Sequence, residues 1–329
     1  MRRVFVYVVS LSGLLLLLAV FILLLRHTRK PGKWFTVKHT EQITRVIFRQ
    51  DSLTLTLKKE NDNWNVNGIW HVRPRAIKTF MKVISGMHVK SPVSGKLLEE
   101  ILSDQKAQHI KVILYHRFFH FRRFEVCKTN RTPWGNIMKL PGRKGWYITY
   151  LPGEEVNPAD FIVLNPYYWR DRTLFHYLPG DVIEVTLKYG DDPAKGFRVG
   201  IDTLKNRYFV KPVIPGGGEG KIDTNNVKRY LTYFQELDCD KYAYALDTAR
   251  KDSILRETPM YSMTLNDRFG KTFIMNTYPV REEKSKQEKP EYDPDVTYAF
   301  IMPMNEMVLL KYYRIDPLIK ELRYFYHVP

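Results

Sequence analysis

The chain has 329 residues, of which 44% are hydrophobic and 14% aromatic, and its formal net charge is +17 at pH 7. This composition excludes an intrinsically disordered chain, because such chains hold too few apolar side chains to bury a core, and the length is enough for one large or two moderate domains. The excess of basic residues predicts an acidic neighbour, such as anionic lipid head groups, an anionic polymer or nucleic acid.

The N-terminal segment from Val4 to Leu25 has no charged residue over 22 positions. A helix of that length spans about 33 Å at about 1.5 Å per residue, which is enough to cross the hydrocarbon core of a bilayer. A cleaved signal peptide has a shorter apolar region, of about 7–15 residues, and it ends in small residues. Here the apolar run leads directly into the basic sequence RHTRK. We therefore expect residues 1–37 to form a cytoplasmic tail, an uncleaved transmembrane anchor at residues 4–25 and a basic linker.

The residues that flank this segment do not orient it in a membrane. Arg2 and Arg3 precede it, and Arg26, Arg29 and Lys30 follow it. Taken literally, the positive-inside rule favours a cytoplasmic body, but the rule describes a bias in charge and both flanks are basic here. Both orientations therefore stay open from the flanks alone.

Residues 38–180 are expected to form three strands and then a helix. The stretches ITRVIFRQ and LTLTLKKE alternate apolar and polar residues on either side of a short turn, which is typical of an antiparallel hairpin. NWNVNGIW follows with an Asn-Gly turn signal. In RPRAIKTFMKVISGM, the spacing of Ile77, Phe80 and Ile84 predicts an amphipathic helix that begins near Pro74.

The same order of elements returns after residue 180. DVIEVTLKYG, GFRVGIDT and RYFVKPV have strand patterns, and DTNNVKRYLTYFQEL places Val227, Tyr230 and Phe234 on one helix face. Further on, GWYITYLPG parallels VTYAFIMPM, and FIVLNPYYWRDRTLF parallels MVLLKYYRIDPLIKEL. We therefore predict an α+β fold: an N-terminal transmembrane helix followed by two tandem, duplicated antiparallel-sheet-plus-helix units, residues 38–180 and 181–329.

The glycine-rich stretch KPVIPGGGEGKIDTNN has the composition of a phosphate-binding loop but not its pattern. The loop G-x-x-x-x-G-K-[ST] requires a glycine where this chain has Pro215 and a hydroxyl where it has Ile222. The stretch lies between a predicted strand and a predicted helix. We therefore predict a turn in which Asp223 or Thr224 caps the helix that follows.

No catalytic or metal-binding motif is recognisable in the chain. His116 and His120 are four residues apart, but IKVILYHRFFHFRRFEVCK is expected to form a hairpin, and four strand positions span about 13 Å at about 3.3 Å per residue, too far to share one ion. A G-x-S-x-G nucleophile motif is missing. Cys127 and Cys239 do not form a disulfide framework, and their pairing stays open. We expect no cofactor, no metal and no catalytic residue, although a site assembled from distant residues leaves no pattern.

Residues 106–144 concentrate ten basic residues, opposed only by Glu125. Aromatic residues interleave with them, so the segment suits an anionic lipid or polymer, or single-stranded nucleic acid held by phosphate contacts and base stacking. A solvated strand face is the alternative. No nucleic-acid-binding module is recognisable, which disfavours nucleic acid. The candidate residues for an anionic partner are Arg117, Arg122, Arg123, Lys128 and Arg131.

The segment YYWRDR lies near the junction of the two predicted units. In an extended chain Arg170 and Arg172 share one side and Asp171 takes the other. Cation–π contacts and ion pairs of this kind are ordinary structural features, so a structural clamp is favoured over a ligand site. The residues of the candidate clamp are Tyr167, Tyr168, Trp169, Arg170, Asp171 and Arg172.

The pattern ITRVIFRQDSLTLTLKKENDNWNVNGIW, followed by a helix and then by YYWRDRTLFHYLPGDVIEVTL, resembles the bacterial domain-of-unknown-function family 4340. The likeness covers most of residues 38–250. It is also distantly similar to a domain in an auxiliary subunit of a gliding-motility transport complex. Family members are commonly single-pass envelope proteins without established catalytic residues, so the resemblance implies an extracytoplasmic body.

Taken together, these patterns predict a membrane-anchored, non-catalytic binding or scaffold component of a bacterial cell-envelope complex. The resemblance implies an inner-membrane location with a periplasmic body and protein partners in the envelope. Two alternatives stay open. One is a cytoplasm-facing protein that binds nucleic acid or another anionic polymer, and the other is an envelope hydrolase whose site is not visible in the sequence.

Overall fold

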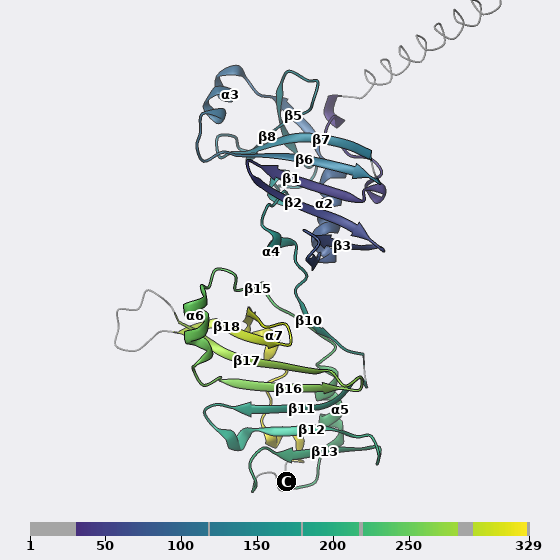
Figure 1. The fold of residues 1–329 in the computed structure, drawn as a ribbon, viewed down its shortest axis with the longest axis vertical. Coiled ribbons are helices and arrows are strands. Elements are labelled where there is room, and N and C mark those ends of the chain that lie inside the picture. Colours follow the sequence, from purple (N-terminus) through teal and green to yellow (C-terminus); the bar gives the residue numbers. More distant parts are fainter. Residues whose placement is uncertain (1–30, 118, 179, 217–219, 282–291, 328–329) are drawn as a thin grey trace, which may run out of the picture. The chain divides into compact units, whose positions relative to one another are not determined.

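The computed structural model describes residues 31–329 except 118, 179, 217–219, 282–291 and 328–329. The chain divides into two compact units, one ending at Asp171 and the other beginning at Arg172 (Figure 1). Each unit contains a large antiparallel sheet with a helix against it.

The described strands of the first unit form a nine-stranded sheet in the order β4-β3-β2-β1-β6-β7-β8-β9-β5. Its strands are β1 (Arg45–Gln50), β2 (Leu53–Glu60), β3 (Asn63–Val66), β4 (Trp70–His71), β5 (His88–Pro92), β6 (Gln108–His116), β7 (Phe119–Lys128), β8 (Asn136–Lys139) and β9 (Trp146–Tyr150). Its helices are α2 (Pro74–Gly86), α3 (Gly95–Leu102) and α4 (Pro166–Trp169), with 3-10 turns η1 (Pro31–Lys33), η2 (Thr40–Gln42) and η3 (Pro158–Phe161). The predicted hairpins and the helix at Pro74 are thereby confirmed.

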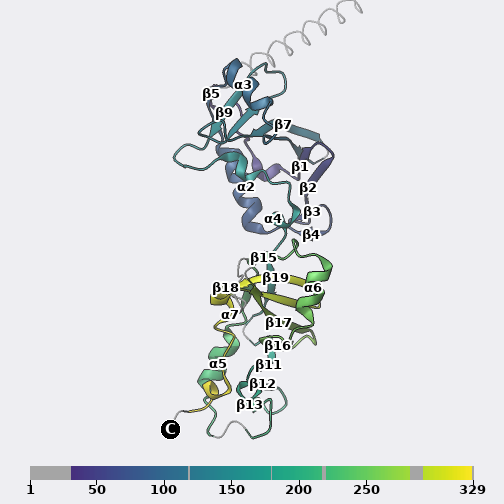
Figure 2. The ribbon, with the colours of Figure 1, turned by 90° about the vertical axis from the view of Figure 1, so that its left-hand side faces the viewer.

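One face of this sheet is the core of the first unit, and the helix α2 lies against it (Figure 2). Strand alternation turns Val46 and Phe48 of β1 toward α2, and helical spacing turns Phe80 toward the sheet. The ring of Phe48 lies 5.5 Å from that of Phe80 and 5.7 Å from that of Trp169, measured between centroids. All three side chains are fully buried, so this aromatic cluster joins the sheet, the helix and the end of the unit.

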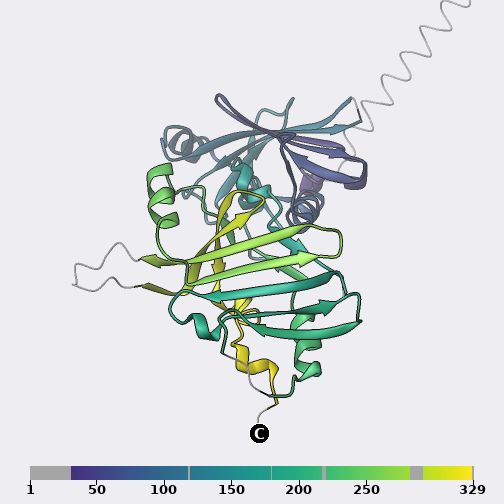
Figure 3. The same cartoon turned by 60° about the horizontal axis from the view of Figure 1, so that its bottom comes forward.

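The second unit is built on an eight-stranded sheet in the order β13-β12-β11-β16-β17-β18-β19-β15, together with the pair β10-β14. Its strands are β10 (Thr173–His176), β11 (Val182–Tyr189), β12 (Phe197–Asp202), β13 (Arg207–Pro212), β14 (Glu236–Asp238), β15 (Lys241–Tyr242), β16 (Tyr261–Asp267), β17 (Thr272–Arg281), β18 (Tyr292–Met302) and β19 (Glu306–Lys311). Its helices are α5 (Thr224–Thr232), α6 (Thr248–Leu255) and α7 (Tyr312–Ile315), with 3-10 turns η4 (Pro193–Lys195) and η5 (Leu322–Phe325). Figure 3 shows the strands of this sheet side by side, from teal through green to yellow.

The helices α5 and α6 lie on opposite sides of the second sheet (Figure 2). On the α5 side, Tyr230 packs between two aromatic rings, with centroid distances of 5.5 Å to Phe197 and 5.2 Å to Phe325. The Tyr230 hydroxyl donates a hydrogen bond to the Leu318 carbonyl at 2.8 Å, which satisfies its buried polar atom. This cluster belongs to the core of the second unit.

The helix α5 begins at the predicted cap. The Asp223 carboxylate accepts hydrogen bonds from the backbone amides of Asn225 at 2.9 Å and Asn226 at 3.1 Å. The prediction that this stretch holds a capped turn is confirmed at Asp223. Gly217, Gly218 and Glu219, in the middle of the glycine-rich stretch, lie outside the described residues.

In both units the C-terminal end pairs with the segment that precedes the long helix. The residues that correspond in this pairing differ from those that the sequence patterns align. In the first unit the Arg73 amide donates to the Trp169 carbonyl at 2.7 Å, and in the second the Asp223 amide donates to the Phe325 carbonyl at 2.8 Å. The end of each unit thus pairs with the segment that precedes its long helix. Trp169 therefore corresponds to Phe325, whereas the sequence patterns had placed the Tyr167 pair over Tyr312.

The predicted fold class is wrong in its balance of elements. Strands hold 43% of the described residues and helices 22%, so the architecture is mostly antiparallel β with two large sheets rather than α+β. The strand β10, assigned from the sequence to the first unit, pairs with β14 of the second. The amphipathic patterns of α2 and α5 gave the helices too much weight, because each of these helices is a single element beside a sheet of eight or nine strands.

The prediction of a transmembrane architecture is also corrected. Across the part of the chain that the structure describes, no helix has both the length and the apolar character needed to cross a membrane. The helix α2 has 13 residues, whereas a span needs about 20. The predicted anchor, residues 4–25, lies outside the described residues. The expected single-pass protein and inner-membrane localisation are therefore not retained.

Candidate functional site

The five predicted anion-binding residues do not share one surface. Strand alternation separates the neighbours Arg122 and Arg123 on β7, because successive side chains point to opposite faces. Arg122 is half-buried, and its guanidinium donates a hydrogen bond to the Trp34 carbonyl. Arg123 is exposed on the sheet face opposite α2. Of these two arginines, only Arg123 is therefore exposed on the face opposite α2.

The other three predicted residues lie elsewhere. Arg117 is exposed in the β6–β7 turn, where its φ of 52° is in the left-handed region. Lys128 is half-buried, and burial lowers the pKa of its ammonium group. Arg131 forms an ion pair with Asp104, with 3.2 Å between Nε and Oδ2. The structure thus distributes these residues over a turn, the core-side face of β7 and a loop.

A different set of cations gathers on the first sheet, and we call it the basic face: Arg49, Lys111, Arg123 and Lys139. Register brings them together from four strands, since Arg49 pairs with Lys111, Lys111 with Glu125, and Glu125 with Lys139. In the neighbouring row Ile47 pairs with Ile113, and Ile113 with Arg123. Paired strand residues share a face, so these two rows form one surface on the side opposite α2.

The charges of the basic face are poorly compensated within the protein. Arg49, Lys111 and Arg123 are exposed, and none of them forms an ion pair with an acid among the described residues. Like charges directly opposite each other on neighbouring strands are destabilising, and Arg49 lies opposite Lys111. Glu125 is the acid within the two rows. An acidic partner would relieve this repulsion.

The ends of the same face are occupied by intramolecular contacts. The guanidinium carbon of Arg45 lies 4.0 Å from the centre of the Tyr115 ring, a cation–π distance. Lys58 forms an ion pair with Glu60, with 2.6 Å between Nζ and Oε1. The Nζ atom of Lys139 lies 5.8 Å from the centre of the Trp146 ring. The uncompensated charge therefore concentrates at Arg49, Lys111 and Arg123.

Most of the predicted clamp, Tyr167 to Asp171, forms the C-terminal end of the first unit. Trp169 is fully buried, and its indole Nε1 donates to the Val163 carbonyl at 2.8 Å. Arg170 is 7% exposed and its guanidinium carbon lies 4.6 Å from the centre of the Trp70 ring. The Asp171 amide donates to the His71 carbonyl at 2.8 Å. These contacts all lie within the first unit.

The remaining clamp residues are divided between the units. The Tyr167 ring lies 5.2 Å from the Trp70 ring, and the guanidinium carbon of Arg73 lies 5.5 Å from the centre of the Tyr168 ring. Both contacts belong to the first unit. Arg172 belongs to the second unit, where its carbonyl accepts a hydrogen bond from the Cys239 amide at 2.8 Å.

The two cysteines are buried and free. Burial raises the pKa of the Cys127 thiol to about 11 and that of the Cys239 thiol to about 12. A thiol must ionise to act as a nucleophile or a metal ligand, so both groups are inert near neutral pH. Over the residues described here, no cluster of three or more His, Cys, Asp and Glu side chains is arranged to hold a metal ion.

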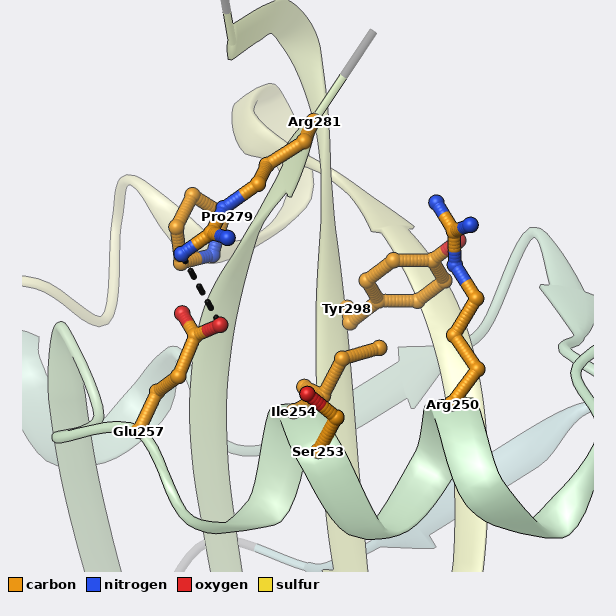
Figure 4. A pocket seen from close by; sticks show the side chains of 7 residues that line it. All are labelled: Arg250, Ser253, Ile254, Glu257, Pro279, Arg281 and Tyr298. Atoms are coloured by element: carbon orange, nitrogen blue, oxygen red, sulfur yellow. Dashed lines mark ion pairs between the residues drawn. The ribbon is translucent and has the colours of Figure 1, made fainter. Parts of the chain in front are cut away.

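The second unit contains a pocket of about 350 Å³ beneath the helix α6. Residues of α6 and its C-terminal end line one wall at the spacing of a single helix face: Arg250, Ser253, Ile254 and Glu257. Strands β17 and β18 line the other wall with Pro279, Arg281 and Tyr298. Figure 4 shows the α6 side chains extending toward the strands, with Arg250 and Tyr298 pointing toward each other. The pocket thus combines two guanidinium groups with hydroxyl and apolar groups.

Sequence reasoning missed most of these residues for identifiable reasons. Arg49 lies outside the basic segment 106–144, and strand alternation alone does not show that β1 pairs with β6. The spacing of Arg250, Ser253 and Glu257 is visible in the sequence. The strands opposite them follow later in the chain, however, and only the fold identifies them.

Comparison of the sequence with models of known protein families finds no match, and comparison with curated proteins finds none either. Membership of family 4340 therefore stays a hypothesis that rests on the residues quoted above. The geometry of the basic face carries the functional interpretation.

Proposed function

We propose that the protein is a non-catalytic binding or scaffold component, and that the basic face of its first unit docks an acidic surface of a partner protein. The observation that carries this proposal is the pair of rows in which Arg49, Lys111, Arg123 and Lys139 gather around a single acid, Glu125, with Arg49 directly opposite Lys111. A folded protein keeps such like-charge pairs at the expense of its own stability. A complementary acidic surface removes that repulsion and uses the charges for recognition.

The apolar residues of the basic face favour a protein over a nucleic acid. Ile113 is partly exposed in the row beside the cations, between the buried Ile47 and Arg123. Protein interfaces are enriched in arginine and combine apolar area with charges. Glu125, between Lys111 and Lys139, would repel a phosphate backbone. A protein partner can place a basic residue opposite Glu125 and acidic residues opposite the two lysines.

The resemblance to family 4340 supports a non-catalytic role, because that family has no established catalytic residues. The buried, protonated thiols of Cys127 and Cys239 agree with such a role. Because the thiolate is the nucleophilic form of cysteine, burial that keeps both thiols protonated makes them unreactive near neutral pH.

The contribution of the basic face to binding is estimated from exposed ion pairs. Each such pair is worth about 0.2–1 kcal/mol, so three contribute about 0.6–3 kcal/mol. This range corresponds to a change in Kd of about 3- to 150-fold. The effect should shrink as salt is added, because the Debye length is only about 8 Å at physiological ionic strength.

The test compares two triple variants of the full-length chain that remove the same charge. The first is Arg49→Gln, Lys111→Gln and Arg123→Gln on the basic face. The matched control is Arg75→Gln, Lys78→Gln and Lys205→Gln, three exposed cations that lie outside it. Binding of a fluorescent poly-glutamate peptide is measured by anisotropy at several salt concentrations. We expect the first variant to bind about 3- to 150-fold more weakly than wild type and the control to bind like wild type.

Two results would overturn this proposal. Equal losses in the two triple variants would mean that net charge, rather than this surface, attracts the peptide. Tighter binding of an unstructured oligonucleotide than of the peptide, lost in the basic-face variant, would assign the same surface to nucleic acid.

A further inference from the structure

One row of the basic face carries its charges in a fixed order across the first sheet. Register places Arg49 opposite Lys111, Lys111 opposite Glu125, and Glu125 opposite Lys139. These four residues lie on the adjacent strands β1, β6, β7 and β8, and we call them the charged row. Read from β1 to β8, the charges are positive, positive, negative and positive.

The side chains of the charged row are available to a partner. Arg49 and Lys111 are exposed and Glu125 is half-buried. Within the described part of the chain, these three side chains form no ion pair. Lys139 lies over the Trp146 ring, with 5.8 Å between Nζ and the ring centre. That contact uses none of the three N–H donors of its ammonium group, so Lys139 can still pair with an acid.

The spacing of the charged row matches one face of a helix. Neighbouring strands lie about 4.8 Å apart, so the three steps of the row span about 14 Å. Helix residues at i, i+3, i+7 and i+10 share a face and span about 15 Å at about 1.5 Å per residue. Four alternate residues of a strand laid along the row would span about 20 Å. A helix therefore fits the row within about 1 Å, whereas a strand is about 6 Å too long.

The helix α3 already packs on this face, beside the charged row. Two positions from Glu125 and Lys139, and so on the same side of the sheet, are Cys127 and Ile137. Both are fully buried in an apolar cluster with Ile101 of α3. In the row on the other side, Ile113 is partly exposed. The charged row thus lies between a helix and apolar surface that a second helix can cover.

On the basis of the docking function proposed above, we propose that the partner presents an acidic helix that lies along the charged row beside α3. The helix presents two acids, a base and an acid, in the order complementary to the row. Its acids pair with Arg49, Lys111 and Lys139. Its base pairs with Glu125. Because Glu125 repels an acid placed opposite it, the order of charges distinguishes this helix from other acidic segments.

Two alanine-rich helical peptides of about 20 residues test the order of charges, since shorter isolated helices are marginal in water. The matched peptide carries Glu, Glu, Lys and Glu at i, i+3, i+7 and i+10. The all-acid peptide has Glu in place of that Lys. Circular dichroism verifies that the two are equally helical. Fluorescence anisotropy measures the Kd of each labelled peptide for the full-length chain at low and physiological salt.

Charge reversal in the protein should shift the preference between the two peptides. Glu125→Lys reverses the third charge of the row, and Glu155→Lys is the matched control, an exposed acid in the loop after β9. The preference is the Kd of the all-acid peptide divided by that of the matched peptide. We expect this ratio to be at least about threefold smaller in Glu125→Lys than in Glu155→Lys, because repulsion replaces the attraction of an exposed ion pair.

A second substitution guards against a loss of folding. Glu125→Gln adds no like charge to the row, and matching thermal melting curves verify that it folds like wild type. Its preference should lie between those of wild type and Glu125→Lys, because the amide neither attracts the peptide's base nor repels an acid.

A third peptide tests the helix itself. It keeps the matched charges but has proline at two positions on the opposite side, which prevents helix formation. We expect the full-length chain to bind it at least about threefold more weakly than the matched peptide, because its charges no longer hold the spacing of the row and must be ordered on binding.

The outcomes separate this inference from the function on which it rests. Binding that the triple variant Arg49→Gln, Lys111→Gln and Arg123→Gln weakens, but that depends on neither the charge order nor the helix, overturns the inference and leaves the docking function standing. Binding that the triple variant does not weaken overturns both. Both are also overturned if none of the peptides reaches saturation.

Discussion

Replacing Asn136 with leucine tests whether a single buried amide holds the end of the first sheet together. Strands β8 and β9 pair Met138 with Tyr147 and Lys139 with Trp146. Continued in the same register, the ladder would bring Asn136 opposite Thr149. There the Asn136 side chain takes the place of the backbone: its Oδ1 accepts from the Thr149 amide at 3.3 Å, and its Nδ2 donates to the Thr149 carbonyl at 3.0 Å.

The surroundings of this amide allow no substitute from solvent. Asn136 and Thr149 are both fully buried. The Asn136 Nδ2 also lies 2.8 Å from the Trp134 carbonyl and 2.9 Å from Oδ1 of Asn157, and the Thr149 hydroxyl donates to Asn136 Oδ1 at 2.6 Å. Leucine fills a similar volume but offers no donor or acceptor. The amide and carbonyl of Thr149 would both lose the hydrogen bonds that Asn136 makes to them.

The expected loss follows from these two groups. A buried polar group left without a partner costs about 1–3 kcal/mol, so Asn136→Leu should lower the free energy of unfolding by about 2–6 kcal/mol. Asn136→Ala should cost less, because the smaller side chain leaves room for water to bind Thr149. Urea denaturation of the full-length chain, followed by tryptophan fluorescence, measures both.

The control is Asn130→Ala, an exposed asparagine in the loop before β8, which should change the free energy of unfolding by less than about 0.5 kcal/mol. Amide exchange at Thr149 supplies a local readout, since that amide should lose protection in Asn136→Leu. A loss smaller than about 1 kcal/mol in Asn136→Leu, with the Thr149 amide still protected, would refute the reasoning.

Two further predictions concern the second unit and the buried thiols. Gly200 of β12 has no room for a side chain, because a Cβ there would lie 2.2 Å from the Ile183 carbonyl oxygen, so Gly200→Ala should destabilise the protein by about 1–3 kcal/mol in the same denaturation assay. An unchanged urea midpoint would contradict this. The pKa values of Cys127 and Cys239 are raised by burial to about 11 and about 12 from an ordinary value of 9.0, so the folded state keeps these protons longer than the unfolded state. Their contribution to stability is present below about pH 9 and is lost as the pH rises toward 11–12. The double variant Cys127→Ala/Cys239→Ala should therefore lose less stability between pH 8 and 11 than wild type, and equal losses would show that the thiols do not contribute.

Local periodicity was enough to identify many individual elements. The alternation around Asp51 predicted the β1–β2 hairpin, and the spacing of Ile77, Phe80 and Ile84 predicted α2. The cap at Asp223 was also visible, because a helix start depends on residues three or four positions apart. These features are decided within a short stretch of chain, and the sequence alone therefore reveals them.

The candidate sites depend on pairings between distant stretches of chain. The basic segment 106–144 appeared as one charged surface, but alternation turns Arg122 toward Trp34 while Arg123 stays exposed on the opposite face. Arg49 joins Lys111 only because β1 pairs with β6 in one particular register. A shift of one residue would exchange the two faces.

Local patterns in the amino-acid sequence reveal the short-range features of this protein: its first hairpins, its two long helices, its turn signals and its excess of positive charge. The tertiary structure alone decided that Trp169 and Phe325 close corresponding units, that like charges meet across β1 and β6, and that α6 borders a pocket whereas α3 covers an apolar core. The physical reason is that side-chain direction follows local backbone periods, whereas strand partners and the packing under a helix are set by contacts between residues far apart in the chain.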